Sequence, residues 1–454
     1  MKRSIRGHLS FSLHRARPCA GSVNNAPPRA DARAEMPRGF ARFRNILAAC
    51  IATRLAVDTT TQLFFPFLQT VALGLGMDIV VLGRLVSLRS LAGLSAPLFG
   101  TAADSYGYRR IMRLSLLLTA AGMFLLGSGA GIWSVVVGMI VSGAGLTGFL
   151  PTCQAYISAR LPFAQRARGI GVLEYSWALA GIVGLPLMGF LFGRFSWQIP
   201  FFVLGGAMLA GWVLIGLLPE ATAGVPVVDP ERARRREAAR KRLRSRSFTP
   251  LLVSLPPLRA QTVAGLFDLG PNWRAALAVI SANALFYFSQ VHILIAHGAW
   301  LETEYGLVPE TLGLVAFAQG AADLCGSVLV SLITDRIGKK RAMQLGMLGS
   351  LLVYLSMPLI NVGLAPVIAA LVLLRFVFEY GIVSAIALIS EQAPDRRGKI
   401  ISLSVALNLL GSTFSGFTGP WMYTRFGVWG LGPVAAMGTL TAFVLLTVWG
   451  RESA

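Results

Sequence analysis

The feature that most constrains this chain is a series of apolar stretches, each about twenty residues long, that runs from Asn45 to Gly450. About twenty apolar residues in a helix are what the hydrocarbon core of a bilayer requires. Only 13% of the residues are charged, roughly half the share found in soluble domains. The stretches therefore exclude a soluble enzyme and indicate an integral membrane protein.

Turn residues and charges divide these stretches into twelve windows. The windows lie at 45–74, 79–102, 111–130, 133–158, 169–193, 199–218, 275–300, 311–333, 342–360, 365–390, 400–422 and 427–449. Backbone groups in lipid must bond within their own segment, and no ten-residue alternating pattern runs through the windows. We therefore expect an all-α integral membrane fold of twelve transmembrane helices.

The basic residues follow the loops with a sharp asymmetry. With both termini on one side of the membrane, that side receives 35 of the 41 Lys and Arg residues, and the other side receives only Arg194 and Arg425. The positive-inside rule then predicts a multi-pass protein of the bacterial inner membrane with both termini cytoplasmic. The net charge of +21 therefore reflects topology and contact with membrane lipid, and we expect no nucleic-acid partner.

Polar segments divide the chain into five parts. Residues 1–44 form a basic cytoplasmic tail that we expect to be disordered, 45–218 and 275–449 are two six-helix bundles, 219–274 is a basic cytoplasmic linker, and 450–454 is a short cytoplasmic tail. Three interpretations of the first part stay open: a plain tail, an overlong start with initiation at Met36, and an organellar transit peptide. The four cysteines lack metal-ligand spacing, so we expect neither a metal site nor a cofactor.

An internal repeat relates the two bundles. The loop after the second window reads GTAADSYGYRR, and the loop after the eighth reads SLITDRIGKKR. Both contain D-x-x-G followed by bases, with the aspartates at Asp104 and Asp335. Ser158 and Ser390, after the fourth and tenth windows, are separated along the chain by the same interval to within one position. The bundles are therefore a parallel tandem duplication related by a pseudo-twofold axis, which is a known plan of transporters.

The first of these loops resembles the signature of the major facilitator superfamily. The residues that carry the resemblance are Gly100, Asp104, Gly107, Arg109 and Arg110, with Asp335, Gly338 and Lys339 in the weaker second copy. The stretches TRLAVDTTTQLFFPFL and HGAWLETEYGL look like a poorly characterised prokaryotic subgroup of that family. The resemblance implies that both loops act as a cytoplasmic gate, with Asp104 facing the eleventh helix and Asp335 the fifth. Ser105 departs from the family pattern because a base usually follows the aspartate.

Charged residues inside the windows are the main functional signal. Arg54 and Asp58, and likewise Arg375 and Glu379, are four residues apart and share one helix face. Arg54 lies about 14 Å into its window at 1.5 Å per residue, so it is near the middle of the membrane. The resemblance places both pairs beside a central pathway, together with Asn283, Gln290 and His292 in the seventh helix. Ionisable groups at that depth face the bundle interior or water.

These residues support two interpretations, namely self-neutralised pairs that help helices pack, or a substrate and proton pathway. In the second, Asp58 and Glu379 carry the proton, and the arginines bind an anionic group of the substrate or hold the acids charged. Arg89, Glu174 and Asp323 lie in helices that the resemblance places at the boundary between the bundles, where we expect charge interactions from one bundle to the other.

The sequence thus predicts a secondary active transporter of a small organic solute that works by alternating access and is coupled to protons. It is expected to be a monomer and not an enzyme, because no nucleophile, base and orienting group occur together. Two alternatives stay open: a receptor or scaffold on the same fold that does not transport, and an uncoupled facilitator. Direction and substrate are not predicted.

Overall fold

Every regular element in the described part of the chain is helical. The structure, a computed structural model, describes residues 38–161, 163–219, 272–392 and 397–452. The helices of the first half are α1 (Arg38–Gln62), α2 (Phe64–Gly74), α3 (Ile79–Leu91), η1 (Ala92–Ser95), α4 (Ala96–Tyr106), α5 (Tyr108–Ser128), α6 (Ile132–Ser158), α7 (Phe163–Leu179), η2 (Ala180–Gly184), α8 (Leu185–Arg194) and α9 (Ile199–Gly216). Those of the second half are α12 (Trp273–Leu294), α13 (His297–Tyr305), α14 (Pro309–Ile337), α15 (Lys339–Ile360), α16 (Leu364–Gln392), α17 (Arg397–Phe426) and α18 (Val428–Trp449).

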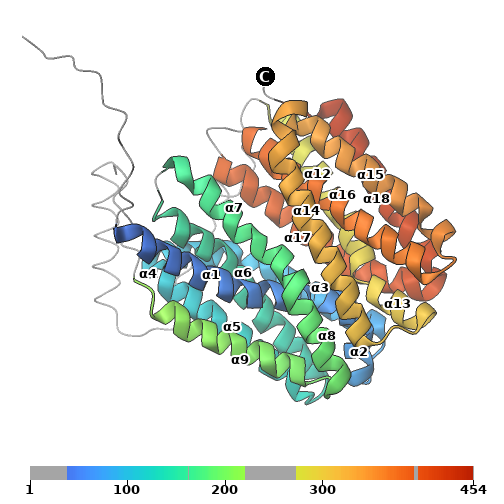
Figure 1. The fold of residues 1–454 in the computed structure, drawn as a ribbon, viewed down its shortest axis with the longest axis horizontal. Helices are drawn as coiled ribbons and strands as arrows, with labels where there is room; N and C mark the ends of the chain where they lie inside the picture. The colour runs from blue at the N-terminus through green and yellow to red at the C-terminus, as the bar shows by residue number, and fades with distance from the viewer. Residues whose placement is uncertain (1–37, 162, 220–271, 393–396, 453–454) are drawn as a thin grey trace, which may run out of the picture. The chain divides into compact units, whose positions relative to one another are not determined.

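These elements make the twelve predicted membrane helices. Ten helices of the described residues are long and apolar enough to cross a membrane, and the first two windows become the interrupted runs α1–α2 and α3–η1–α4. Residues 45–454 form one unit, in which the helices of the first half, blue to green in Figure 1, are followed by those of the second half, yellow to red. The prediction of a twelve-helix all-α fold is confirmed. The tail and linker predicted at 1–44 and 219–274 fall almost entirely outside the described residues.

The interruptions have local causes. Pro66 lacks an N–H, and its ring blocks the carbonyl of Gln62, so the hydrogen bonding of the first membrane helix is interrupted between α1 and α2 and the backbone kinks at Phe67, where φ and ψ are −111° and 18°. In the fifth membrane helix, the π-helical turn η2 lies between α7 and α8, directly before Pro186. Both breaks lie close to the boundary between the two halves, where they set the backbone of the site described below.

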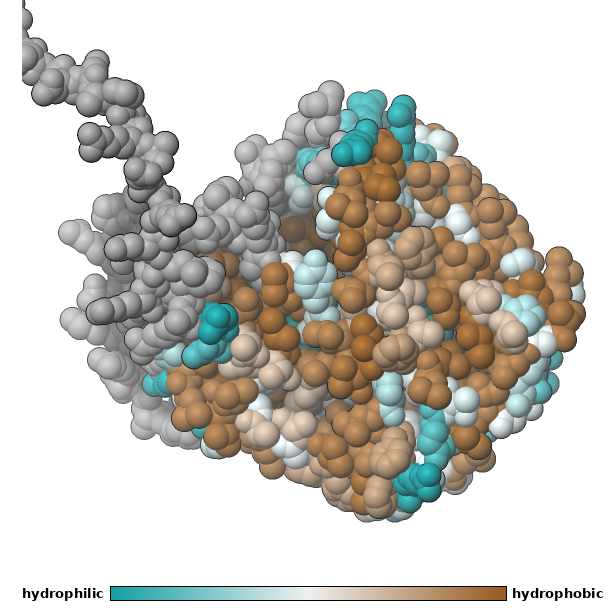
Figure 2. Space-filling view, viewed as in Figure 1, coloured by the Kyte–Doolittle hydropathy of each residue, from teal (hydrophilic) through white to brown (hydrophobic). Residues whose placement is uncertain are grey.

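The bundle has two ends that are useful as landmarks. The basic end carries the turns at Gly107 and Gly338, and the far end carries the turns at Gly76, Gly306 and Gly427. At the far end one hydrophobic core joins residues of both halves, including Phe67 and Trp300, which are fully buried. In the second half a separate core lies around Phe286 and Phe378. Hydrophobic side chains also cover most of the coloured surface in Figure 2, as lipid contact requires.

Candidate functional site

In the first half, Arg54 holds two carboxylates. Its terminal nitrogens donate to both oxygens of Glu174 on α7, at 2.9 and 2.7 Å, and its Nε lies 3.4 Å from Oδ2 of Asp58. Asp58 also accepts a hydrogen bond from Ser176, and Glu174 accepts one of 2.8 Å from Gln154. The Arg54 and Asp58 side chains are buried, whereas that of Glu174 is 48% exposed. Because a bidentate pair is the stronger arrangement, Glu174 is the main partner of Arg54.

In the second half, Arg375 pairs with Asp323 and not with Glu379. Arg375 on α16 donates to Oδ2 of Asp323 on α14, and both side chains are buried. Glu379, one turn beyond Arg375, accepts a hydrogen bond of 2.8 Å from Ser327. The structure therefore differs from the predicted pairing of Arg375 with Glu379, because the neighbouring helix α14 supplies a carboxylate that no spacing within one helix reveals.

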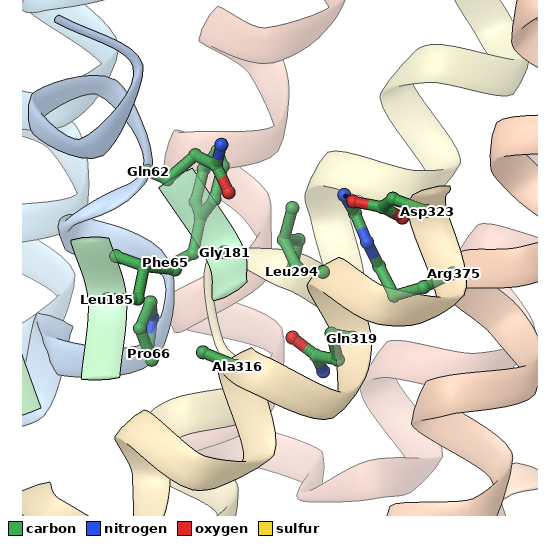
Figure 3. A pocket seen from close by; sticks show the side chains of 11 residues that line it. Gln62, Phe65, Pro66, Gly181, Leu185, Leu294, Ala316, Gln319, Asp323 and Arg375 are labelled. Carbon is green, nitrogen blue, oxygen red and sulfur yellow. Dashed lines mark hydrogen bonds and ion pairs between the residues drawn. The ribbon is translucent and has the colours of Figure 1, made fainter. Parts of the chain in front are cut away.

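A small cavity lies between the two halves, next to this ion pair. Figure 3 shows Gln62, Phe65 and Gly181 of the first half on one side of it, and Gln319, Asp323 and Arg375 of the second half on the other. The cavity volume is about 10 Å³, which is room for roughly one water molecule. The cavity brings together the predicted residues Asp323 and Arg375, and it is called the inter-half cavity below.

Sequence reasoning missed the two amides of this cavity, Gln62 and Gln319. Both side chains are buried, at 5% and 6% exposure. Gln319 precedes Asp323 by four residues, so one face of α14 carries an amide and an acid in an apolar helix. That spacing is the same signal that singled out Arg54 and Asp58, and it could have found Gln319.

The three polar residues predicted on the seventh helix bond within the second half and do not line the inter-half cavity. Asn283 donates to Ser404 and Asn408 of α17, at 3.2 and 3.0 Å. Gln290 accepts a 3.0 Å hydrogen bond from Tyr354 of α15. The remaining one, His292, lies 2.9 Å from the hydroxyl of Thr418 and 3.4 Å from the carbonyl of Gly430. These contacts join helices of one bundle.

The charges expected to act between the bundles also find partners in their own half. Glu174 binds Arg54, and Asp323 binds Arg375. Arg89 of α3 donates to the carbonyls of Thr60 and Thr61, at 3.0 and 2.8 Å, where α1 ends. A cation suits that position because the last carbonyls of a helix are its negative end. Thus the structure does not show the predicted charge interactions between halves at these three residues.

The signature loops form matching turns at the basic end. Gly107 and Gly338 have φ of +94° and +89°, a backbone conformation that residues other than glycine rarely adopt. Arg109 donates to the carbonyls of Gly216 and Leu218 at the end of α9. In the second loop, Lys339 pairs with Glu391 of α16. These bases bind within their own halves.

Other members of the predicted gate give less information. Arg110 is exposed. Only the backbone of Gly100, Asp104 and Asp335 is described, in α4 and α14, so the predicted contacts of the two aspartates lie outside the described side chains.

Several contacts cross from one half to the other beside the inter-half cavity and toward the far end. Thr70 of α2 donates to Glu302 of α13. Glycines allow backbones to approach at two places: a Cβ on Gly181 would lie 2.8 Å from Cα of Gly320, and one on Gly298 would lie 2.0 Å from the carbonyl oxygen of Pro66. Figure 1 shows α2 and α8 meeting α13 and α14 in this region. The far end is therefore closed in this structure.

Comparison with known proteins decides the family. A model of the Major Facilitator Superfamily matches residues 50–298 and again residues 279–454. The chain belongs to the Major Facilitator Superfamily. Membership explains the parallel repeat, and it identifies the protein as a multi-pass integral membrane protein and a secondary transporter of small solutes.

Relatives of similar length support this assignment. The chain is 24% identical over 387 residues to the uncharacterized MFS-type transporter YwfA of Bacillus subtilis, which covers 84% of this chain and 86% of the relative. It is 24% identical over 404 residues to YceJ, another uncharacterized MFS-type transporter of that organism, with coverage of 87% and 95%. A solved D-xylose-proton symporter has a TM-score of 0.69 at 15% identity, covering 90% of this chain and 98% of that one. At such identity the likeness concerns the fold alone.

Proposed function

We propose that the protein carries a small organic solute across the bacterial inner membrane by alternating access, coupled to protons. The observation that supports proton coupling is that carboxylates outnumber arginines in two clusters, one in each half. Arg54 is accompanied by Asp58 and Glu174, and Arg375 by Asp323 and Glu379, so each of these two clusters holds two carboxylates for one arginine. A net charge in the membrane interior is costly, and one bound proton in each cluster removes it.

The contacts favour Asp58 and Glu379 as the proton carriers. In each half one acid takes the direct pairing with the arginine, namely Glu174 with Arg54 and Asp323 with Arg375. The other acid is held chiefly by a serine hydroxyl, which also suits a protonated carboxyl because a hydroxyl can accept as well as donate. Protonation of these two acids therefore disturbs the pairing least.

The two ends of the bundle fit an alternating cycle. With the basic end in the cytoplasm, as the distribution of charge predicts, the far end faces the periplasm and is closed here by Thr70, Glu302 and the glycine contacts. The bases Arg109 and Lys339 bind within their own halves in this state. We place the cytoplasmic gate of Asp104 and Asp335 in the opposite state, where their helices approach the other half. Direction of net transport follows from the gradients that are imposed.

Flux into proteoliposomes tests this proposal. The full chain is reconstituted, an inside-alkaline pH gradient is imposed, a mixture of metabolites and drugs is offered, and luminal contents and pH are measured. We expect accumulation of a solute with matching proton movement, which Asp58→Asn abolishes while solute exchange persists. Asp78→Asn is the matched control, because Asp78 is exposed at the far end and caps α3, a task that asparagine performs equally well.

Other outcomes separate the alternatives. Full accumulation by Asp58→Asn would exclude Asp58 as a coupling group, and solute movement that ignores the pH gradient would indicate an uncoupled facilitator. Folded protein that moves no solute under either gradient polarity would indicate a receptor or scaffold.

A further inference from the structure

The inter-half cavity holds an unpaired donor and an unpaired acceptor. Nε2 of Gln319 and Oδ1 of Asp323 are buried, and neither has a hydrogen-bond partner among the described residues. The two side chains are only 6% and 2% exposed. They come from consecutive turns of α14 and line the same space. Buried polar atoms are nearly always paired in folded proteins, so this pair of atoms points to a ligand.

The charge of the cavity limits what that ligand can be. Arg375 donates to the other oxygen of Asp323, so the ion pair is already formed. The two remaining polar residues that line the cavity, Gln62 and Gln319, are uncharged amides. Glu379, the second acid of this half, does not line the cavity, and it is neutral in the protonated state proposed above, so a charged group placed here would have no counter-ion. The cavity therefore suits an uncharged group.

Hydrogen-bond chemistry narrows the class further. The group must donate to Oδ1 of Asp323 and accept from Nε2 of Gln319. An ammonium group has no acceptor and a carboxylate has no donor, whereas a hydroxyl is both. The cavity volume of about 10 Å³ favours one small group, and a hydroxyl is smaller than a planar carboxamide, which also donates and accepts.

We propose that the inter-half cavity is the subsite for a hydroxyl group, and that the transported solute is an uncharged hydroxylated compound. This inference rests on the proposed transport function. It also connects the two halves, because Gln62 and Gly181 of the first half line the same cavity and Gly181 touches Gly320 of the second. A solute whose hydroxyl occupies this subsite contacts both halves at the point where they meet.

Binding to the purified full chain in detergent tests the subsite without requiring transport. The probes are sets of four compounds that share one skeleton and differ in one group, such as cyclohexylmethanol, cyclohexylmethylamine, cyclohexanecarboxylate and cyclohexanecarboxamide, with equivalent sets on three-, five- and six-carbon polyols. Titration calorimetry gives each Kd. We expect at least one alcohol to bind about tenfold or more tightly than its three analogues, because the amine and the carboxylate bring a charge and lose an acceptor or a donor, and the carboxamide is larger than a hydroxyl.

Two variants connect binding with the cavity. Gln319→Met keeps the volume and removes the amide, and it should weaken binding of the alcohol about tenfold or more. Gln344→Met is the matched control, since Gln344 of α15 bonds to Thr447 near the basic end. If Gln319→Met does not fold, Gln319→Asn provides a second test, because it keeps an uncharged amide but shortens the side chain by one methylene and so withdraws the donor from the hydroxyl.

The results that overturn this inference differ from those that overturn transport. No binding of any alcohol, equal binding of the charged or carboxamide analogues, or an affinity in Gln319→Met within twofold of wild type would each reject the hydroxyl subsite. If an alcohol binds through Gln319 but proteoliposomes move no solute, the subsite stands and transport fails. If a charged solute is accumulated by wild type and by Gln319→Met alike, transport stands and the subsite fails.

Discussion

Arg109 and Lys340 occupy equivalent positions in the two signature loops, and each donates to the carbonyls that end the last helix of its own half. Arg109 binds the carbonyls of Gly216 and Leu218, and Lys340 binds those of Thr447 and Gly450 at the end of α18. The interval along the chain from Gly216 to Thr447 equals that from Arg109 to Lys340. In this conformation, a base of each signature loop therefore binds the end of the last helix of its own half.

A second pair of contacts repeats the arrangement. Arg160, at the end of the fourth membrane helix, donates to the carbonyl of Pro219 at 2.7 Å, and Gln392, at the end of the tenth, donates to that of Arg451 at 2.7 Å. The two donors and the two acceptors are separated along the chain by one and the same interval. In each half, two side chains at equivalent positions therefore donate hydrogen bonds to carbonyls at the end of the last helix.

Removal of these bases should lower stability. Arg109→Ala and Lys340→Ala each leave helix-terminal carbonyls without their cation, so we expect each variant to lose about 1 kcal/mol. The midpoint of thermal unfolding in detergent measures the loss. Arg110→Ala and Arg341→Ala are matched controls, because these neighbours are exposed and are themselves equivalent in the repeat. A control that loses as much as its partner would show that the loops act only through their net charge.

The contact between Gly181 and Gly320 should control closure of the far end. A Cβ on Gly181 would lie 2.8 Å from Cα of Gly320, so Gly181→Ala must separate α14 from the π-helical turn η2. We expect a shift toward states with an open far end. Double electron–electron resonance measures it as the distance between spin labels at positions 73 and 308, which are exposed there. Gly206→Ala is the control, since a Cβ at Gly206 meets nothing within 4 Å. Identical distance distributions in both variants would contradict this account.

The sequence predicts the fold well because the membrane imposes strict rules. Span length, the sides on which bases lie and the D-x-x-G repeat each depend on local residues, and the predicted windows match helices of the structure. Breaks within the membrane helices are harder to predict from the sequence. Pro66 and Pro186 lie beside the two breaks, but a proline alone does not specify that a span takes a π-helical turn, as it does at Ala180–Gly184.

Thr70 and Glu302 form a second contact whose loss should open the far end. Thr70→Val keeps the shape of the side chain and leaves the carboxylate without this donor, and hydrogen bonds to charged groups contribute about 1.5–3 kcal/mol. We expect the population with an open far end to rise about tenfold or more, by the same spin-label distances. Thr61→Val is the control, because that hydroxyl bonds to Val57 in its own helix. Equal effects of the two variants would show that the bond between halves contributes nothing.

Charge partners are the part of the site that sequence alone could not assign. Spacing placed Arg54 near Asp58 and Arg375 near Glu379, yet the closest partners are Glu174 and Asp323, which come from other helices. A helix face is fixed by the spacing of residues along the chain, whereas the helix opposite is fixed by packing. For the same reason Gln319 could be found as a polar residue in a span, but its position in the inter-half cavity could not.

The ion pair between Arg375 and Asp323 should contribute more through the charge it neutralises than through its own attraction. Both side chains are buried, so Arg375→Met leaves Asp323 and Glu379 near each other without a cation, and removal of one partner of a buried pair costs about 3 kcal/mol or more. Asp323→Asn in the same chain removes one of those charges, and we expect the double variant to be more stable than Arg375→Met alone. A double-mutant cycle on unfolding in detergent measures the coupling. Glu304→Gln combined with Arg375→Met is the control, because Glu304 is exposed and bonds to Asn361. If the Asp323 substitution restores no more stability than the Glu304 substitution, the loss of stability in Arg375→Met does not come from the uncompensated charge of Asp323.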